Sequence, residues 1–444
     1  MSSSRREFLR RSGAATLLGT VSLPALARAS TLHAAESAEP LAPGLPGVDY
    51  TPVVTPNNVA LPFRIVDGVK VFHLVAEAVT HEFAPGLVGE CWGYNGRVHG
   101  PTIEAVEGDR VRIYVTNRLD APTTVHWHGL AIPNGMDGVG GLTQRVIESG
   151  ETFRYEFTLR QHGTYMYHSH HDEMTQMALG LMGLFVVHPR NPTGPRPDRD
   201  YAYLLSEWKL DPGTRRPDPN EMMDFNVLTL NGKIHPATEA MVARRGERVR
   251  IRIGNLSAMD HHPMHVHGHA FQVVETDGGV IPEAGRWPEV SVLVPVGSTR
   301  TIELVADNPG DWAFHCHMTH HVMTQMGHGI PNLVGVDPGA FDDEITKRVP
   351  AFAAVGGAMA ADSGAAAGMD WGEEQADPAV PRNSLPMIGG AGPSGYITMG
   401  GMFTIMKVRD ELPASGDGGW YANPPGTQAD AATAEELKRD GIEP

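Results

Sequence analysis

The sequence predicts an all-β protein built from two tandem β-sandwich units, and three observations carry this prediction. Segments such as 110–115 and 153–157 alternate polar and apolar residues, which is typical of a strand with one buried face. The 444 residues include 51 glycines and 35 prolines, a composition that favours a turn-rich β architecture over helix bundles. In addition, several segments recur in the same order along the chain, which indicates a tandem duplication.

The duplication defines the expected domain boundaries. Four pairs of segments match: 93–99 with 230–235, 107–113 with 245–251, 126–129 with 265–268, and 163–170 with 310–317. We therefore expect a first domain over residues 50–188, a Pro- and Arg-rich linker over 189–200, and a second domain over 201–338. Residues 339–444 are expected to form an irregular extension rich in Ala, Gly and Pro, in which 396–398 and 402–406 could add strands to a neighbouring sheet.

Residues 1–29 have the pattern of an export signal. Arg5 and Arg6 are followed by Phe8 and Leu9, and then by an apolar stretch that is too short to span a bilayer. The segment resembles a twin-arginine signal, which implies export of an already folded protein to the periplasm or to the outside. No other segment approaches the apolar length of a membrane span, so we expect no membrane anchor.

Charge and cysteine content exclude other classes of protein. The formal net charge is −17, so nucleic acids and anionic lipids would be repelled and neither is an expected partner. Two cysteines in the whole chain rule out a disulfide framework. Cys91 is expected to pack as a small core residue.

Histidine carries the functional prediction. The 22 histidines include five His-x-His pairs, and residues i and i+2 of a strand face the same side. His315 and His317 should therefore point one way and Cys316 the other, so that one tripeptide reaches two metal centres. Two histidines, one cysteine and a long axial methionine form a blue-copper site. We assign this site to His262, Cys316, His321 and Met326.

Four of the five His-x-His pairs predict a second copper centre. They are His126/His128, His168/His170, His265/His267 and His315/His317. Eight imidazoles without a carboxylate suit copper better than magnesium, calcium or manganese. Zinc also binds imidazole, but it has no use for an adjacent thiolate–methionine site, and eight ligands exceed one tetrahedral centre.

These motifs resemble the four copper signatures of the multicopper oxidases, in the family's order, over roughly residues 60–337. The resemblance implies two cupredoxin domains, each a Greek-key β-sandwich, and four coppers per chain. His126 and His265 would hold the type 2 copper. The type 3 pair would take His128, His168, His170, His267, His315 and His317. The implied reaction is one-electron oxidation of a small reducing substrate at type 1, electron transfer along Cys316, and four-electron reduction of O2 to water.

The first domain departs from this pattern at Ser169, which stands where Cys316 stands in the repeat. Serine cannot supply the thiolate of a blue site, so we expect no type 1 copper there. With only two matching domains, the chain resembles the two-domain, laccase-like branch of the family. That branch builds its cluster between domain 1 of one subunit and domain 2 of the next, which implies a homotrimer.

Acidic residues near the copper ligands are candidates for delivering the protons that O2 reduction consumes. Asp137 matches the acidic residue near the type 2 copper in relatives, although an Asp before Gly138 is also an ordinary turn residue. Val322 stands where some relatives carry a second acid. Asp172 or Glu173 could replace that acid, and a solvated loop charge is the alternative for each.

Several electron donors and functions fit the motifs. The donor could be phenolic or a metal ion. Four methionines near type 1 ligands raise a cuprous-oxidase or copper-tolerance role, with core packing as the alternative. They are Met259, Met264, Met318 and Met323. A copper nitrite reductase would need a type 1 site in the first domain, which Ser169 argues against. A copper-storing or structural protein would be expected to lack ligands, and none is missing.

Overall fold

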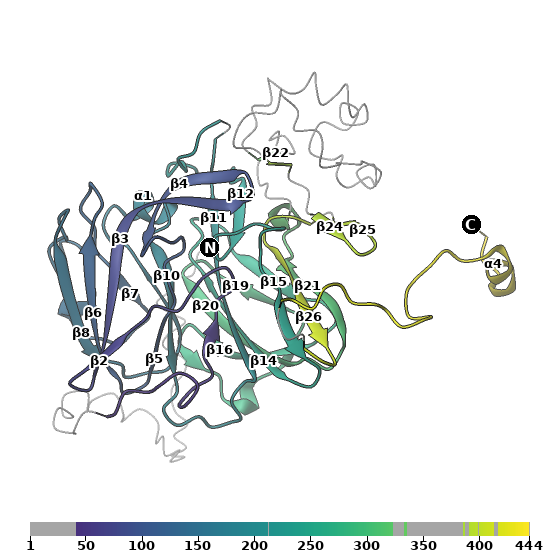
Figure 1. The fold of residues 1–444 in the computed structure, drawn as a ribbon, viewed down its shortest axis with the longest axis horizontal. Coiled ribbons are helices and arrows are strands. Elements are labelled where there is room, and N and C mark those ends of the chain that lie inside the picture. Colours follow the sequence, from purple (N-terminus) through teal and green to yellow (C-terminus); the bar gives the residue numbers. More distant parts are fainter. Residues whose placement is uncertain are drawn as a thin grey trace, which may run out of the picture. The chain divides into compact units, whose positions relative to one another are not determined.

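The computed structural model describes residues 41–211, 213–322, 333–334, 385–386, 390–397, 399–412 and 416–443 (Figure 1). These residues are mainly β-strand, as predicted. The helical elements are short: η2 (Asn134–Met136), α1 (Glu173–Ala178), η3 (Glu283–Gly285), η4 (Thr319–Val322) and α4 (Ala434–Asp440). No helix in this part of the chain is long and apolar enough to cross a membrane.

The first sandwich consists of two sheets that enclose one core. One sheet contains β2 (Arg64–Val66), β3 (Val69–Ala84), β4 (Leu87–Tyr94), β6 (Arg110–Asn117) and β8 (Thr152–Thr158). The other contains β5 (Ile103–Val106), β10 (Met182–His188), β9 (Gly163–His168) and β7 (His126–His128). Buried side chains from both sheets, such as Ile113 and Trp127, belong to the same hydrophobic cluster. The alternation in 110–115 therefore does mark a strand with one core-facing side.

The second sandwich repeats this plan. Its larger sheet contains β1 (Val53–Val54), β11 (Arg199–Trp208), β12 (Val227–Leu230), β14 (Arg248–Asn255), β16 (Phe271–Thr276), β17 (Gly279–Val280), β18 (Pro288–Glu289) and β20 (Ser298–Val305). Its other sheet has the order β13 (Met241–Arg244), β26 (Phe403–Arg409), β21 (Gly310–Cys316), β15 (His262–Val266) and β19 (Ser291–Val294). Ile251 and Phe314 represent the two sheets in the common core.

Strand β26 comes from the region expected to be an irregular extension. It lies between β13 and β21, as β10 lies between β5 and β9 in the first sandwich. The strand predicted over 402–406 is thus confirmed, and the sheet extends beyond the expected boundary at residue 338. The strand near 396 joins only a small hairpin, formed by β24 (Gly390–Gly392) and β25 (Gly395–Ile397). The remaining pair is β22 (Leu333–Val334) with β23 (Leu385–Pro386).

The sheets are mixed, with parallel as well as antiparallel neighbours. Strand β3 runs parallel to β6, β5 to β10, β11 to β14, and β13 to β26. These partners are distant in sequence, so long crossovers join them, and a crossover can return the chain in the same direction. Local alternation reveals a strand's buried face but carries no information about such a partner.

Buried ion pairs connect the two sandwiches. Arg252 on β14 is bonded to Asp200 at 2.8 and 3.0 Å, and to Glu275 on β16 at 3.2 Å. The same guanidinium donates a 2.8 Å hydrogen bond to Thr164 on β9 of the first sandwich. An apolar cluster that includes Met166 and Leu204 packs beside this network. The strand that carries His168 is therefore held against the second sandwich.

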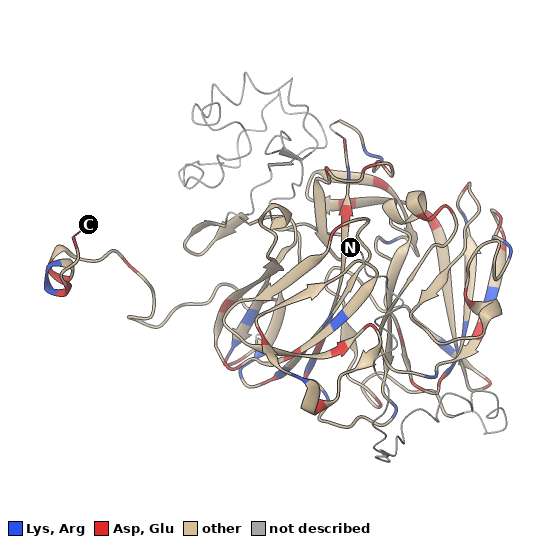
Figure 2. Ribbon diagram, turned by 180° about the vertical axis from the view of Figure 1, so that it is seen from behind, with Lys and Arg blue, Asp and Glu red and all other residues tan. Residues whose placement is uncertain are grey.

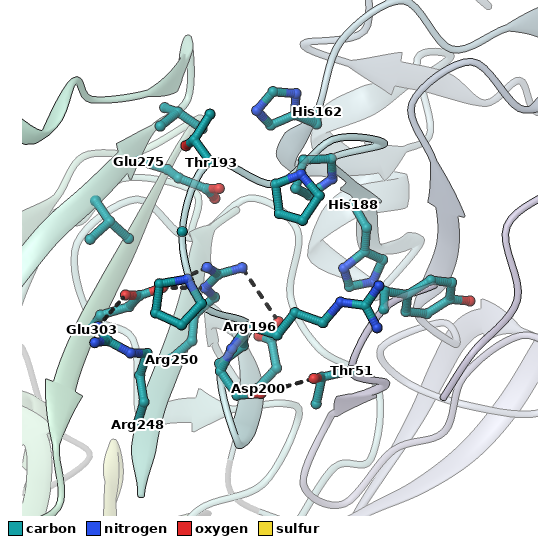
Figure 3. Close-up of a pocket in the computed structure, with 18 of the residues that line it drawn as sticks. Thr51, His162, His188, Thr193, Arg196, Asp200, Arg248, Arg250, Glu275 and Glu303 are labelled. Carbon is teal, nitrogen blue, oxygen red and sulfur yellow. Dashed lines mark hydrogen bonds and ion pairs between the residues drawn. The ribbon is translucent and has the colours of Figure 1, made fainter. Parts of the chain in front are cut away.

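A cavity of about 590 Å³ lies between the sandwiches, and residues 191–197 form part of its lining (Figure 3). Arg250 and Glu303 in its wall form a 2.5 Å ion pair. None of the predicted copper ligands lines it. Figure 2 shows Lys and Arg interspersed with Asp and Glu along the ribbon, without a separate basic region.

Candidate metal centres

Three of the four predicted type 1 residues meet in one buried cluster. His262 begins β15, Cys316 ends β21 and His321 lies in η4. Strands β15 and β21 are antiparallel neighbours, which brings the first two residues together. Cys316 Sγ lies 3.7 Å from His262 Nδ1 and 3.3 Å from His321 Nδ1, and the two nitrogens are 3.0 Å apart. Met326 lies outside the described residues.

Hydrogen bonds and burial determine which atoms of this cluster can bind a metal cation and in which protonation state. Ser257 Oγ lies 2.7 Å from His262 Nε2, so the Nδ1 atom is the one left facing Cys316. Burial lowers the pKa of His321 to about 4 and raises that of Cys316 to about 12. The imidazole is therefore neutral, and the sulfur becomes a thiolate only beside a cation. Two imidazoles and a thiolate form a donor set that fits copper.

Glu207 on β11 supports the cluster from outside, and the sequence did not reveal it. Its Oε1 accepts hydrogen bonds from the main-chain N–H groups of Met259 and Asp260, at 2.5 and 3.3 Å. Asp260 in turn places Oδ2 3.7 Å from His321 Nε2. Burial and the neighbouring Asp260 carboxylate raise the pKa of Glu207 well above its usual range. No sequence signal could have found this contact, because 52 positions separate the bonded residues.

The predicted histidines of the first sandwich form one group. His126 and His128 lie on β7, and His168 ends the adjacent strand β9. Ligand nitrogens of these three residues all lie within 4.8 Å of one another. The His170 ring is 5.4 Å from that of His126. The His168 Nδ1 group donates to the carbonyl of Ser169 at 2.8 Å, so its Nε2 is the nitrogen that faces the other ligands, 3.3 Å from His128 Nδ1. Burial lowers the pKa of His168 to about 3, so the ring stays neutral.

The second sandwich contains a matching group. The His265 ring centroid lies 4.7 Å from that of His267, 5.6 Å from that of His315 and 5.4 Å from that of His317. The His315 Nδ1 group donates to the carbonyl of Cys316 at 2.7 Å, which repeats the His168–Ser169 contact. His267 and His317 are exposed. Among the described residues, no hydrogen bond or ring contact joins the two four-histidine groups, so each group supplies four of the eight predicted ligands.

Two acidic residues adjoin the first group. The His126 Nδ1 group donates to the main-chain carbonyl of Asp137 at 2.8 Å, and the Asp137 carboxylate lies 3.5 Å from the same nitrogen. Glu173 places one oxygen 3.6 Å from His168 Nδ1 and the other 3.8 Å from His170 Nε2. Both carboxylates therefore lie beside predicted ligands.

The first sandwich has a hydrogen-bonded polar triad where the second has the sulfur-containing cluster. Ser169 Oγ, in the place of Cys316, bonds to Gln176 Oε1 and lies 3.4 Å from Thr123 Oγ1. Thr123 precedes His126 by three residues, as His262 precedes His265. These side chains satisfy one another and offer no thiolate.

The methionines expected near type 1 differ in exposure. Met259 is 50 % exposed and Met318 is 37 % exposed. Met264 is fully buried in the core of the second sandwich, so for this residue packing is the correct interpretation. Met323 lies outside the described residues. Cys91 is buried among apolar side chains, as predicted.

Comparisons with known proteins agree with this architecture. A family model described as multicopper oxidase matches residues 76–192, and a second one with the same description matches residues 211–334. Copper resistance protein A of Pseudomonas syringae pv. tomato is 30 % identical over 232 residues, which cover 41 % of this chain and 38 % of that protein. Multicopper oxidase MmcO of Mycobacterium tuberculosis is 33 % identical over 227 residues, 43 % of each chain.

The match to these two proteins spans less than half of their length. Among solved structures, the multicopper oxidase mgLAC has a TM-score of 0.53 and 33 % identity, and the match covers 57 % of this chain and 80 % of that one. The two family models together cover more than half of the chain, one on each sandwich. The chain belongs to the multicopper oxidase family.

Proposed function

We propose that the protein is a two-domain oxidase that couples oxidation of a small reducing substrate to reduction of O2 to water. The observation that carries this proposal is the position of Cys316 between two centres: its sulfur faces His262 and His321, and its carbonyl accepts the hydrogen bond of His315. When bound, copper supplies one-electron exchange at the sulfur site and O2 reduction at the histidine sites.

The chain's own residues provide the route and the environment. The peptide link from Cys316 to His315 is a continuous covalent path between the two sites. Buried, neutral imidazoles keep their lone pairs available to metal at moderately acidic pH. Asp137 lies beside His126, where a carboxyl group can hold and release protons that O2 reduction consumes. Glu173, beside His168 and His170, is placed for the same task.

Four coppers per chain are proposed, with the histidine and cysteine ligands named from the sequence. The type 1 copper takes His262, Cys316 and His321 together with an axial methionine. The other three coppers take the two four-histidine groups. Because each group is only half of the set, we propose a homotrimer in which the first sandwich of one subunit meets the second sandwich of the next. The polar Thr123–Ser169–Gln176 triad supports the absence of a type 1 copper from the first sandwich.

Metal analysis, absorption spectroscopy and mass measurement test this proposal on one sample. We expect about four coppers per chain, blue absorption, O2 consumption and the mass of a trimer. One copper or none per chain would contradict the oxidase, and a copper-loaded monomer would contradict the shared cluster. Nitrite reduction in place of O2 consumption would favour a nitrite reductase.

A cuprous-oxidase function is the second candidate. The exposed Met259 and Met318 favour it, because thioethers bind Cu(I) and both residues neighbour predicted ligands. Turnover with Cu(I), Mn(II) and a dimethoxyphenol, compared on one copper-loaded sample, distinguishes the donors. Cu(I) oxidation no faster than phenol oxidation would contradict this candidate.

Export by the twin-arginine route, to the periplasm or the outside, is also proposed from residues 1–29, which lie outside the described residues. Changing Arg5 and Arg6 to Lys should retain the protein in the cytoplasm, as cell fractionation would show.

A further inference from the structure

A blue-copper site has a fourth donor, a weak and long axial thioether. The sequence predicts Met326 as this donor because of its spacing from His321. We propose instead that Met402, 86 residues after Cys316, supplies the axial thioether of the type 1 site. This inference rests on the proposed oxidase function and specifies one ligand of its electron-accepting site.

Strand register places Met402 beside Cys316. In the antiparallel pair β21–β26, His315 is opposite Phe403. The same register sets Met402 opposite Cys316, and the Cys316 N–H donates to the Met402 carbonyl at 3.1 Å. Opposite residues of antiparallel strands project from the same face of the sheet, with Cβ atoms about 4.5–5.5 Å apart. The Met402 side chain therefore leaves the sheet on the side of the Cys316 sulfur.

The main chain also ties Met402 to a second member of the cluster. The Met402 N–H donates to the carbonyl of His321 at 3.1 Å. Met402 is fully buried and belongs to the same apolar cluster as Cys316. A buried methionine is thus bonded through its main chain to both Cys316 and His321.

Met264 is the competing buried methionine, because it faces Cys316 from β15. On that strand His262, two residues before Met264 and on the same face of the sheet, is itself a member of the cluster. Met264 therefore lies farther along β15, toward the core of the sandwich. On the β26 side the equivalent position is Gly400, which has no side chain. Met402, directly before β26, is therefore the residue on this side whose side chain lies nearest to the cluster in the strand register.

The first sandwich provides an internal comparison. There the Ser169 N–H donates to the carbonyl of Leu181 at 3.0 Å, in the same register as Cys316 and Met402. The position of Met402 is thus occupied by leucine in the repeat where Cys316 is replaced by serine. Both sulfur donors are absent together from the sandwich that has no type 1 cluster, which is the pattern expected if they serve one metal.

The test is the reduction potential of the type 1 copper in the copper-loaded protein. Removing a donor to Cu(II) favours Cu(I), whereas a stronger oxygen donor disfavours it. Met402→Leu should therefore raise the equilibrium constant for reduction by ferrocyanide at least tenfold, and Met402→Gln should lower it at least tenfold. Matched variants Met264→Leu and Met326→Leu should stay within threefold of wild type. A purely structural role would not give opposite signs for Leu and Gln.

Absorption and electron paramagnetic resonance spectra provide readouts independent of turnover. Both Met402 variants should retain a type 1 copper with altered spectra, because leucine conserves the volume of methionine. The proposal is overturned if Met326→Leu produces the shift while the Met402 variants do not, or if both Met402 variants shift in the same direction. A wild-type protein without blue absorption would overturn the proposed function as well, whereas a blue wild type with unaffected Met402 variants overturns only this inference.

Discussion

The hydrogen bond between Ser257 and His262 allows a quantitative prediction. Ser257 Oγ lies 2.7 Å from His262 Nε2, and both residues are buried. The change Ser257→Ala leaves this nitrogen without a partner, which costs about 1–3 kcal/mol in a buried site. Because the bond also orients the ligand ring, we expect type 1 copper affinity to fall about 10–100-fold.

Competition with a copper chelator, followed by the blue absorption, measures this affinity, and urea unfolding of the copper-free protein measures stability. Ser206→Ala is the matched control, because Ser206 Oγ is buried and lies 3.0 Å from Nε2 of His99, which is not a proposed ligand. The control should lose stability but keep its copper affinity. Wild-type affinity in Ser257→Ala, or an equal loss in Ser206→Ala, would refute the assigned role of the bond.

Three further predictions concern protons and backbone. Asp137→Asn should slow reoxidation by O2 about 100-fold or more while the blue absorption stays unchanged, as stopped-flow mixing would show; unchanged reoxidation contradicts the proton role. Burial lowers the pKa of His99 from its ordinary 6.5 to about 3, so its contribution to stability is complete above pH 6.5 and is lost as the pH falls toward 3. His99→Gln should make the loss shallower by up to about 1.4 kcal/mol per pH unit in urea titrations, and an equally steep loss contradicts this. Gly138→Ala should lower the free energy of unfolding by at least about 2 kcal/mol, because φ is +84° and a Cβ would strike the Val125 carbonyl. Gly141→Ala, at φ +81° in open space, should have a smaller effect.

The metal-site residues could be predicted largely because they occur in short local motifs. Alternation along a strand separates Cys316 from His315 by geometry alone, and the structure places their side chains in different clusters. The same reasoning groups His126 with His128. Such predictions need only the direction of neighbouring side chains, which strand geometry determines.

What could not be predicted depends on contacts between distant segments. Glu207 lies on β11 and accepts hydrogen bonds from the loop before His262. The sequence around Glu207 resembles that of any buried strand and does not indicate this contact. The pairing of β26 with β21 joins segments more than 80 residues apart. Spacing after His321 favours Met326, because it is a near-neighbour rule. Such a rule cannot include the proposed Met402, which lies on a segment that returns from far along the chain.

The late position of β26 has a consequence for protein synthesis. Until residues 403–409 have left the ribosome, the strand that ends in Cys316 lacks its neighbour on one side, and its edge is open to pairing with other chains. Contacts of such large sequence separation also form slowly. A nascent chain arrested before residue 403 therefore holds the Cys316 thiol on an incomplete sheet, and the pocket around this thiol can close only after β26 has emerged. Factors that shield open strand edges should matter most during that interval.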